Sequence, residues 1–169
     1  PGQPKAGDVA IALPSSGVHS NGYSLVRKII ELSGSDLDAA PPFDSTAATL
    51  GDAVMAPTRI YQKAAAIALQ IGGINGIVHV TGGGLIENPS RVYHDDLALK
   101  IDCAARPLPP IFAWLRDQGA MELQELARTF NCGMGLLIFV DSGKSDAVLT
   151  ALQNGPEPDA WVAGELTHR

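Results

Sequence analysis

Short apolar runs alternate with longer helix-forming segments along the whole chain, and this alternation restricts the folds available to it. A buried strand is typically a run of about four to eight apolar residues bounded by turn residues. The sequence predicts strands at residues 9–13, 77–80, 97–101, 135–140 and 161–164. Strands alternating with helices indicate an α/β (α+β) architecture, a layered sheet of about five or more strands with flanking helices. We expect a mixed sheet, because not every connection is long enough to guarantee a parallel crossover.

The segments between these runs have the periodicity of helices. Helices are predicted at residues 23–32, 58–71, 111–118, 121–129 and 144–153. In the first of them, Val26 and Ile29 fall on one side, and Gly34 is expected to end the helix. Residues 35–57 are mixed in character, and Asn75-Gly76 predicts a turn before the second strand.

Composition indicates one domain of ordinary size and argues against several functional classes. The 169 residues are 46% hydrophobic, which suffices for a core, and the net charge of −6 disfavours nucleic-acid binding, which needs clustered cations. No apolar run approaches the roughly 18 residues of a membrane helix. Two cysteines are too few for a disulfide framework, so a cytoplasmic location is expected. The histidines and cysteines lack zinc-ligand spacing, and no metal site is expected.

The first candidate site is the loop Ser15–Gly22, between a predicted strand and a predicted helix. Its glycines permit positive φ angles and close approach of a ligand, and Ser20 or Asn21 can cap the helix. Free N–H groups at a helix start suit a phosphate or carboxylate. A tight turn with an ordinary cap explains the spacing equally well. His19 is either a structural hydrogen-bonding group or a catalyst.

The second candidate site is the loop Thr81–Gly84, which follows a buried strand that contains His79. Three consecutive glycines cost backbone entropy, and a closely approaching ligand is one reason to keep them. Ligands of α/β sheets bind beyond the carboxyl ends of strands, where this loop falls. The alternative is a glycine-rich turn packed against another backbone.

A third glycine-containing segment, Asn131–Gly135, lies before the fourth predicted strand. A nucleophilic role for Cys132 has little support, because no base lies near it in the sequence. A buried structural thiol is the favoured interpretation.

Taken together, these segments resemble the aminoimidazole ribonucleotide synthetase (phosphoribosylformylglycinamidine cyclo-ligase) family. The resemblance rests on four ordered motifs: Gly7-Asp8-Val9 with Ser15 to Lys28, Ala56 to Tyr61, His79 to Gly84 with Glu87-Asn88, and Arg128 to Gly135. They cover nearly the whole chain. One departure is that Asn88 runs directly into Pro89, where the family usually has an apolar residue first.

The resemblance implies that residues 1–169 are a single carboxy-terminal, substrate-side domain of a two-domain, homodimeric enzyme. The family closes the ring of formylglycinamidine ribonucleotide with ATP, in purine biosynthesis. Its ATP and Mg²⁺ are bound mostly by an amino-terminal domain that this sequence lacks. We therefore expect no cofactor in this chain alone, and we expect the chain alone to be inactive. The expected partners are the ribonucleotide, the amino-terminal domain and a second subunit, with neither nucleic acid nor membrane.

Site residues follow from this resemblance. Ser16, Gly17, Ser20 and Gly22 are expected to bind an anionic group of the substrate, while His19 and Asn21 orient the reacting groups, with His19 as the candidate catalytic base. The residues His79, Thr81, Gly82, Gly83 and Gly84 are expected to line the substrate cleft.

Two other functions stay open at this point. One is a related ATP-dependent small-molecule kinase or synthetase of the same superfamily. The other is an isolated domain that binds a ligand or partner without catalysis.

Overall fold

A central sheet of five strands organises the computed structural model, which describes residues 2–169. The strands are β1 (Val9–Pro14), β2 (Ile74–His79), β3 (Leu97–Ile101), β4 (Met134–Val140) and β5 (Trp161–His168). Their order in the sheet is β2-β4-β1-β5-β3, and all four pairings are antiparallel. The expected α+β class and strand number are confirmed. The expected mixed arrangement is wrong: β1, β2 and β3 run one way, β4 and β5 run the other way, and the two groups alternate across the sheet.

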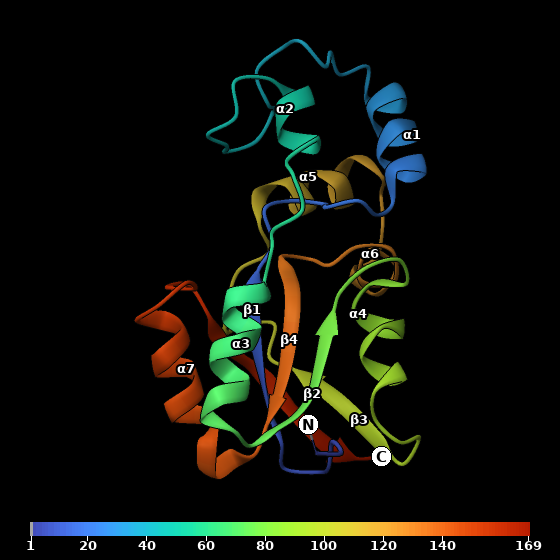
Figure 1. The fold of residues 1–169 in the computed structure, drawn as a ribbon. Coiled ribbons are helices and arrows are strands. Elements are labelled where there is room, and N and C mark those ends of the chain that lie inside the picture. The colour runs from blue at the N-terminus through green and yellow to red at the C-terminus, as the bar shows by residue number, and fades with distance from the viewer. Residues whose placement is uncertain (1) are drawn as a thin grey trace.

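Helices cover both faces of this sheet. The α-helices are α1 (Tyr23–Ser33), α2 (Leu50–Val54), α3 (Gln62–Ile71), α4 (Gly84–Glu87), α5 (Pro110–Gln118), α6 (Leu123–Thr129) and α7 (Ser145–Gln153). Short 3₁₀ helices are η1 (Pro89–Arg91) and η2 (Ser142–Lys144). Figure 1 shows α3 and α7 side by side along the sheet, α4 and α6 together at another side, and α1, α2 and α5 beyond one end of the strands.

The alternation of side chains in β1 explains the two-layer core. Ala10 and Ala12 belong to one buried cluster, which also holds residues of α1, α5 and α6. Ile11 and Leu13 belong to a second cluster, with residues of α3 and α7. Successive side chains of a strand point to opposite faces, so a strand with four buried residues in a row must be covered on both sides.

Two local predictions differ from the structure. The Asn75-Gly76 turn lies inside β2, where the amide of Asn75 donates to both carboxylate oxygens of buried Asp8, at 3.0 and 2.9 Å. The helix expected from residue 58 begins at Gln62, because residues 57 and 58 bond to the loop after β1. The last strand starts at Trp161, as expected, and continues to His168, where it pairs with all of β3.

Candidate functional site

The loop of residues 15–22 leaves β1 at the end of the sheet and is fastened to the segment that precedes α3. The hydroxyl of Ser16 donates to the carbonyl of Pro57 at 2.5 Å. The hydroxyls of Ser20 and Thr58 lie 3.2 Å apart. These contacts fix a surface loop that would otherwise be mobile, and they bring residues 57 and 58 to the candidate site.

Asn131 holds the same loop from the opposite side. Its side chain is buried, donates to the carbonyl of Gly17 at 3.0 Å, and accepts from the N–H of Gly133 at 2.8 Å. The neighbouring Cys132 is also buried, and desolvation raises the pKa of its thiol to about 12. A thiol that stays protonated is a poor nucleophile, so Cys132 has the structural character that was expected of it.

The start of α1 lacks the side-chain cap that the sequence predicted. Gly22, and neither Ser20 nor Asn21, is the N-cap residue, with a φ of 72°, and no side chain bonds to the first turn. A side chain at Gly22 would meet the ring of Phe130 at 2.4 Å, so glycine is needed here for packing as well as for the backbone. The uncapped N–H groups of the first turn carry partial positive charge and are available to an anion.

The second loop is held by one amide side chain. Asn88, which is buried, accepts hydrogen bonds from the backbone N–H and the hydroxyl of Thr81 and donates to the carbonyl of Gly82 at 2.8 Å. Asn88 lies at the carboxyl end of α4, so this short helix and the loop form one unit. The sequence motif contained Asn88, but only the structure shows its positioning role.

The three glycines of this loop have different reasons to be glycine. A β-carbon at Gly82 would lie 3.8 Å from Oδ1 of Asn21, so this is where the two candidate loops approach each other. Gly83 and Gly84 have φ angles of 99° and 58°. A β-carbon at Gly84 would lie 2.1 Å from the carbonyl oxygen of Ala127 in α6. Gly84 therefore supports helix packing, and Gly82 alone faces the other loop.

Three rings gather where the two loops meet the sheet. The centroids of His19 and His79 are 6.2 Å apart, and Tyr61 lies 6.3 Å from the first and 5.8 Å from the second. Tyr61 is buried and donates its hydroxyl hydrogen to the carbonyl of Pro14 at 2.7 Å, whereas His79 is exposed. The cluster thus joins a buried phenol and a buried imidazole to an imidazole that solvent or a ligand can reach.

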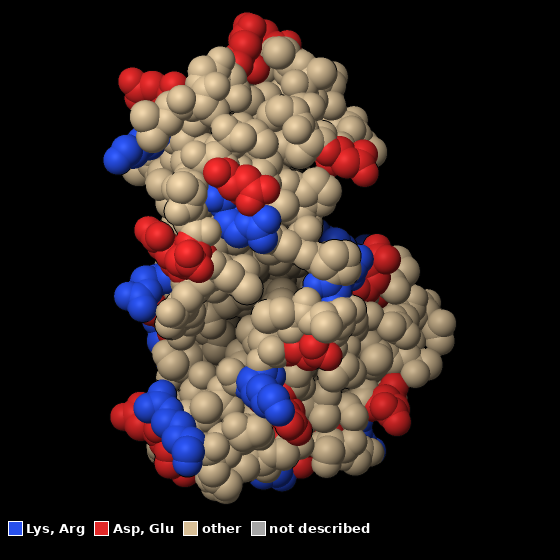
Figure 2. Space-filling view, turned by 180° about the vertical axis from the view of Figure 1, so that it is seen from behind, with Lys and Arg blue, Asp and Glu red and all other residues tan. Residues whose placement is uncertain are grey.

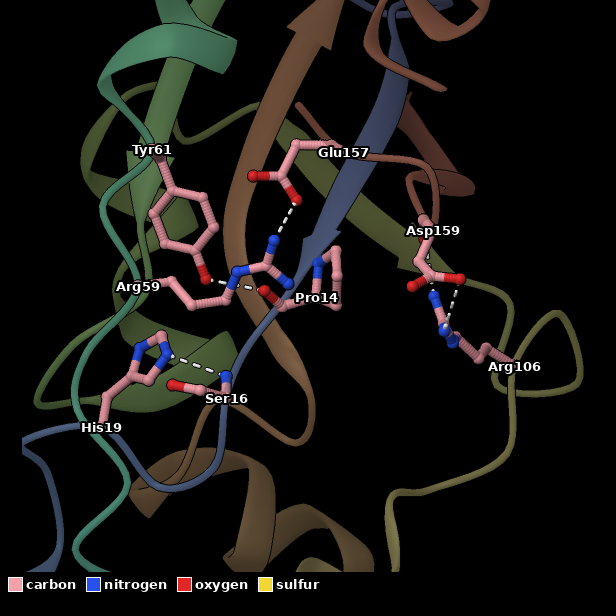
Figure 3. A network of polar contacts seen from close by, with 8 residues as sticks. All are labelled: Pro14, Ser16, His19, Arg59, Tyr61, Arg106, Glu157 and Asp159. Atoms are coloured by element: carbon pink, nitrogen blue, oxygen red, sulfur yellow. Dashed lines mark hydrogen bonds and ion pairs between the residues drawn. The ribbon is translucent and has the colours of Figure 1, made fainter. Parts of the chain in front are cut away.

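His19 is held as a neutral imidazole. Only 2% of the residue is exposed, its φ is 56°, and its Nε2 accepts from the N–H of Ser16 at 3.2 Å (Figure 3). Burial lowers its pKa to about 4, with further contributions from the charges of His79 and Arg59. With Nε2 engaged as an acceptor, Nδ1 carries the hydrogen, and this buried donor has no partner among the described residues.

Arg59 and Glu157 form an ion pair beside these rings that sequence reasoning missed. Arg59 Nη2 lies 2.6 Å from Glu157 Oε2, and the guanidinium lies 5.8 Å from the centre of the Tyr61 ring (Figure 3). Glu157 is 3% exposed, and the side chain of Arg59 is 33% exposed. Burial raises the pKa of Glu157, and Arg59 opposes that shift. The pair fixes a guanidinium near His19 and ties the loop before α3 to the segment before β5.

The expected site residues are therefore only partly brought together. His19 lies near His79, and Asn21 lies near Gly82. In contrast, Gly84 packs against α6, and Gly22 packs against Phe130, the residue after α6. Across residues 2–169, no three His, Cys, Asp or Glu side chains gather as a metal site would require. In the same residues, no helix is long and apolar enough to cross a membrane.

Comparison with known proteins places this geometry in a family. Residues 5–169 match the model of "AIR synthase related protein, C-terminal domain". The phosphoribosylformylglycinamidine cyclo-ligases of Burkholderia cenocepacia and Paraburkholderia phymatum are each 46% identical to the chain over 160 residues. The match covers 95% of this chain and 44% of each relative, so the chain spans less than half of their length.

Solved structures agree on the fold. Two crystal structures of Escherichia coli HypE, one described as a hydrogenase maturation protein, match with TM-scores of 0.59 and 0.63 at 21% and 19% identity. Each match covers 98% of this chain and 45% of the HypE chain. At this identity the likeness concerns the fold alone. The match along residues 5–169 and the 46% identity together show that the chain belongs to the family of AIR synthase related proteins, as their C-terminal domain.

Proposed function

We propose that this chain is the substrate-side domain of a phosphoribosylformylglycinamidine cyclo-ligase. One observation supports this most directly: the two glycine loops converge at Asn21 and Gly82, beside a buried imidazole that has an unused N–H group. Such an arrangement presents fixed hydrogen-bond donors to a polar ligand. The 46% identity to cyclo-ligases supports the choice of reaction.

The start of α1 is proposed to bind the phosphate of the ribonucleotide. No side chain caps its first turn, and Ser20 lies three residues before the first residue of the helix. Backbone N–H groups at a helix start bind anions without a cationic side chain, which suits a domain with a net charge of −6. Arg59 adds a fixed positive charge near the same loop.

The proposed reaction closes an imidazole ring. The formyl amide oxygen takes a phosphoryl group from ATP, releasing ADP. The internal nitrogen then attacks the activated carbon, a C–N bond forms, phosphate leaves with the C–O bond, and a proton is lost. We propose that His19 donates Nδ1–H to an acceptor of the substrate or phosphoryl group, because its low pKa and engaged Nε2 disfavour a role as a base. His79, exposed beside it, is the proposed proton carrier.

ATP and Mg²⁺ are proposed to bind mainly outside this chain. No set of acidic and histidine side chains within residues 2–169 forms a metal cluster. Magnesium in phosphoryl-transfer sites needs carboxylate ligands besides the phosphates. The amino-terminal half found in the longer relatives is the proposed source of that site and of the homodimer contact.

A chimera tests the proposal. Residues 1–169 replace the matched part of the Burkholderia cenocepacia cyclo-ligase, and the purified protein is assayed for aminoimidazole ribonucleotide formed from formylglycinamidine ribonucleotide and ATP. We expect activity within about tenfold of the unaltered enzyme. A folded, dimeric chimera with no turnover would contradict the proposed function.

A substitution in the chimera tests the anion site. Gly17 has a φ of 150°, which a valine adopts only with strain, and the loop that it belongs to precedes α1. Gly17→Val is expected to raise KM for the ribonucleotide at least tenfold. Gly143→Val, at a glycine with no atom within 4 Å of an added β-carbon, is the control and should leave KM unchanged. An unchanged KM in Gly17→Val would remove this loop from the site.

A further inference from the structure

A separate cavity lies on the sheet face opposite α3 and α7. Its volume is about 710 Å³, within the range of roughly 300–1,000 Å³ typical of small-molecule sites. Its walls come from α4, β3, α6 and the loop of residues 102–109. Figure 2 shows the molecule from behind, with a hollow in the middle of this face and both basic (Lys or Arg) and acidic (Asp or Glu) side chains around it. No residue of the loops 16–22 and 81–84 lines the cavity.

The cavity floor is apolar. The side chains that form most of it are those of Leu85, Tyr93, Leu99, Ile101, Leu108 and Met134. All six belong to, or pack against, the core cluster on this face of the sheet. Apolar surface of this extent is stabilised by contact with an apolar ligand, at roughly 25 cal/mol per Å² removed from water. The occupant should therefore have an apolar body.

The charges around the cavity favour an anion. Three arginines line it, Arg106, Arg116 and Arg169, against one acidic residue, Glu87. Arg116 has an acidic partner in its sequence neighbour, at 2.7 Å. Arg169 donates its Nε–H to a backbone carbonyl at 3.1 Å, and no ion pair within residues 2–169 includes it.

Arg106 is held rigidly at the other end of the cavity from Arg169. Its guanidinium lies 4.6 Å from the centre of the Trp161 ring. It also donates to the carbonyl of Asp159 at 2.6 Å (Figure 3). The carboxylate of Asp159 is 3.8 Å away, which is a weak ion pair at a surface. A guanidinium that is fixed mainly by a ring and a neutral carbonyl keeps positive charge available to a ligand.

We propose that this cavity binds an amphipathic organic anion, with its apolar body against β3, α4 and α6 and a single carboxylate, sulfonate or phosphate at Arg106. The site goes beyond the proposed ring closure and uses none of its residues. The cavity and the candidate active site have α4 in common, because α4 lines the cavity and is followed by Asn88, which holds the second glycine loop. A ligand in the cavity therefore lies next to the candidate active site.

The 169-residue chain is tested with 8-anilinonaphthalene-1-sulfonate as a fluorescent probe. We expect saturable binding of one probe per chain. Dodecanoate should displace the probe, while dodecyltrimethylammonium, which has the same tail and the opposite charge, should displace it at least tenfold less well. Equal displacement by the two surfactants would overturn the assignment of an anion site.

Variants locate the binding. Ala127→Trp and, independently, Leu99→Trp fill the cavity from α6 and from β3, and each should abolish binding. Arg106→Gln should weaken dodecanoate binding about tenfold, whereas Arg27→Gln, at an exposed arginine on α1, is the control and should leave it unchanged. Circular dichroism identifies any variant that fails to fold. If one of the two tryptophan variants does not fold, probe binding by the other one tests the proposal. Full probe binding in a folded filled variant would overturn the proposal.

Two further measurements separate a small ligand from other occupants. Cys103 lines the cavity and is exposed, so dodecanoate should slow its alkylation by iodoacetamide severalfold. Sedimentation then tests for a second copy of the chain. If the chain forms a dimer that both filled variants dissociate, a second copy occupies the cavity and the proposal is wrong.

Discussion

Removing Arg59 should expose how much stability depends on its ion pair with Glu157. The Glu157 side chain is 4% exposed, and its carboxylate lies 2.6 Å from the guanidinium. In Arg59→Met the carboxylate keeps its buried position and loses its compensating charge. Breaking a buried pair in this way typically costs about 3–5 kcal/mol, because an uncompensated charge is left behind.

Protonation limits this cost. Glu157 has an ordinary pKa of 4.5, and holding such a carboxyl protonated at pH 7 costs about 3.4 kcal/mol, at 1.36 kcal/mol per pH unit. Arg59 is itself a third exposed, so water entering its place should reduce the loss to about 2–3 kcal/mol. Burial holds the folded-state pKa of Glu157 above its ordinary value, and nearby Asp159 raises it further. The stability linked to Glu157 is then fully present below pH 4.5 and is lost as pH rises through the folded-state pKa.

Urea unfolding at pH 7 and pH 5 measures this dependence, with tryptophan fluorescence as the signal. Arg59→Met should lose about 2–3 kcal/mol at pH 7 and under about 1 kcal/mol at pH 5. The double variant Arg59→Met/Glu157→Gln should recover most of the loss and depend little on pH. Lys63→Met, the same type of change at an exposed lysine, should stay within about 0.5 kcal/mol of wild type. An equal loss at both pH values would refute the reasoning.

Three other outcomes follow from the site. Gly135→Ala should cost about 1–3 kcal/mol in urea unfolding, because the added carbon would overlap the Tyr61 hydroxyl and lie 2.8 Å from the His19 ring, whereas Gly143→Ala should stay within about 0.5 kcal/mol. Iodoacetamide should modify exposed Cys103 in the native chain and Cys132, with a pKa of about 12, only after unfolding, as mass spectrometry would show; native labelling of both would contradict this. By NMR, His19 should titrate near pH 4. The stability that its neutral ring contributes is fully present above pH 6.5 and is lost as the pH falls through 4, so the free energy of unfolding should fall less steeply with acid in His19→Asn than in the wild type. A His19 pKa near 6.5 would count against a buried neutral ring.

The strands were predictable from sequence because their alternation is local. Every predicted strand is present. The apolar runs of β1 and β4, for example, are buried on both faces of the sheet, and this does not depend on which strands pair with them. Strand order and direction were not predictable, because periodicity carries no information about which strand pairs with which. The same limit explains the error at Asn75, whose turn-like sequence is overridden by its buried bonds to Asp8.

The candidate site was also predictable from the sequence only in part. The loops with His19 and His79 were found because glycines and histidines stand close together in sequence, and the structure brings both rings to one cluster. Arg59 and Glu157 were missed because their chemistry depends on a contact between residues 98 apart. Gly84 was assigned to a substrate cleft, whereas its nearest neighbours are backbone atoms of α6, a packing requirement that the sequence does not display.

The position of β1 at the middle of the sheet has a consequence for synthesis on the ribosome. This strand is made first, yet its partners are β4 and β5, with Val9 opposite Val140 on one side and Glu165 on the other. At about 5–20 residues per second, its apolar residues wait roughly 8–30 s for the second partner. During that interval an unpaired hydrophobic strand is available for wrong associations. A nascent chain interrupted before β5 should therefore depend on chaperones, although most of its helices are already complete.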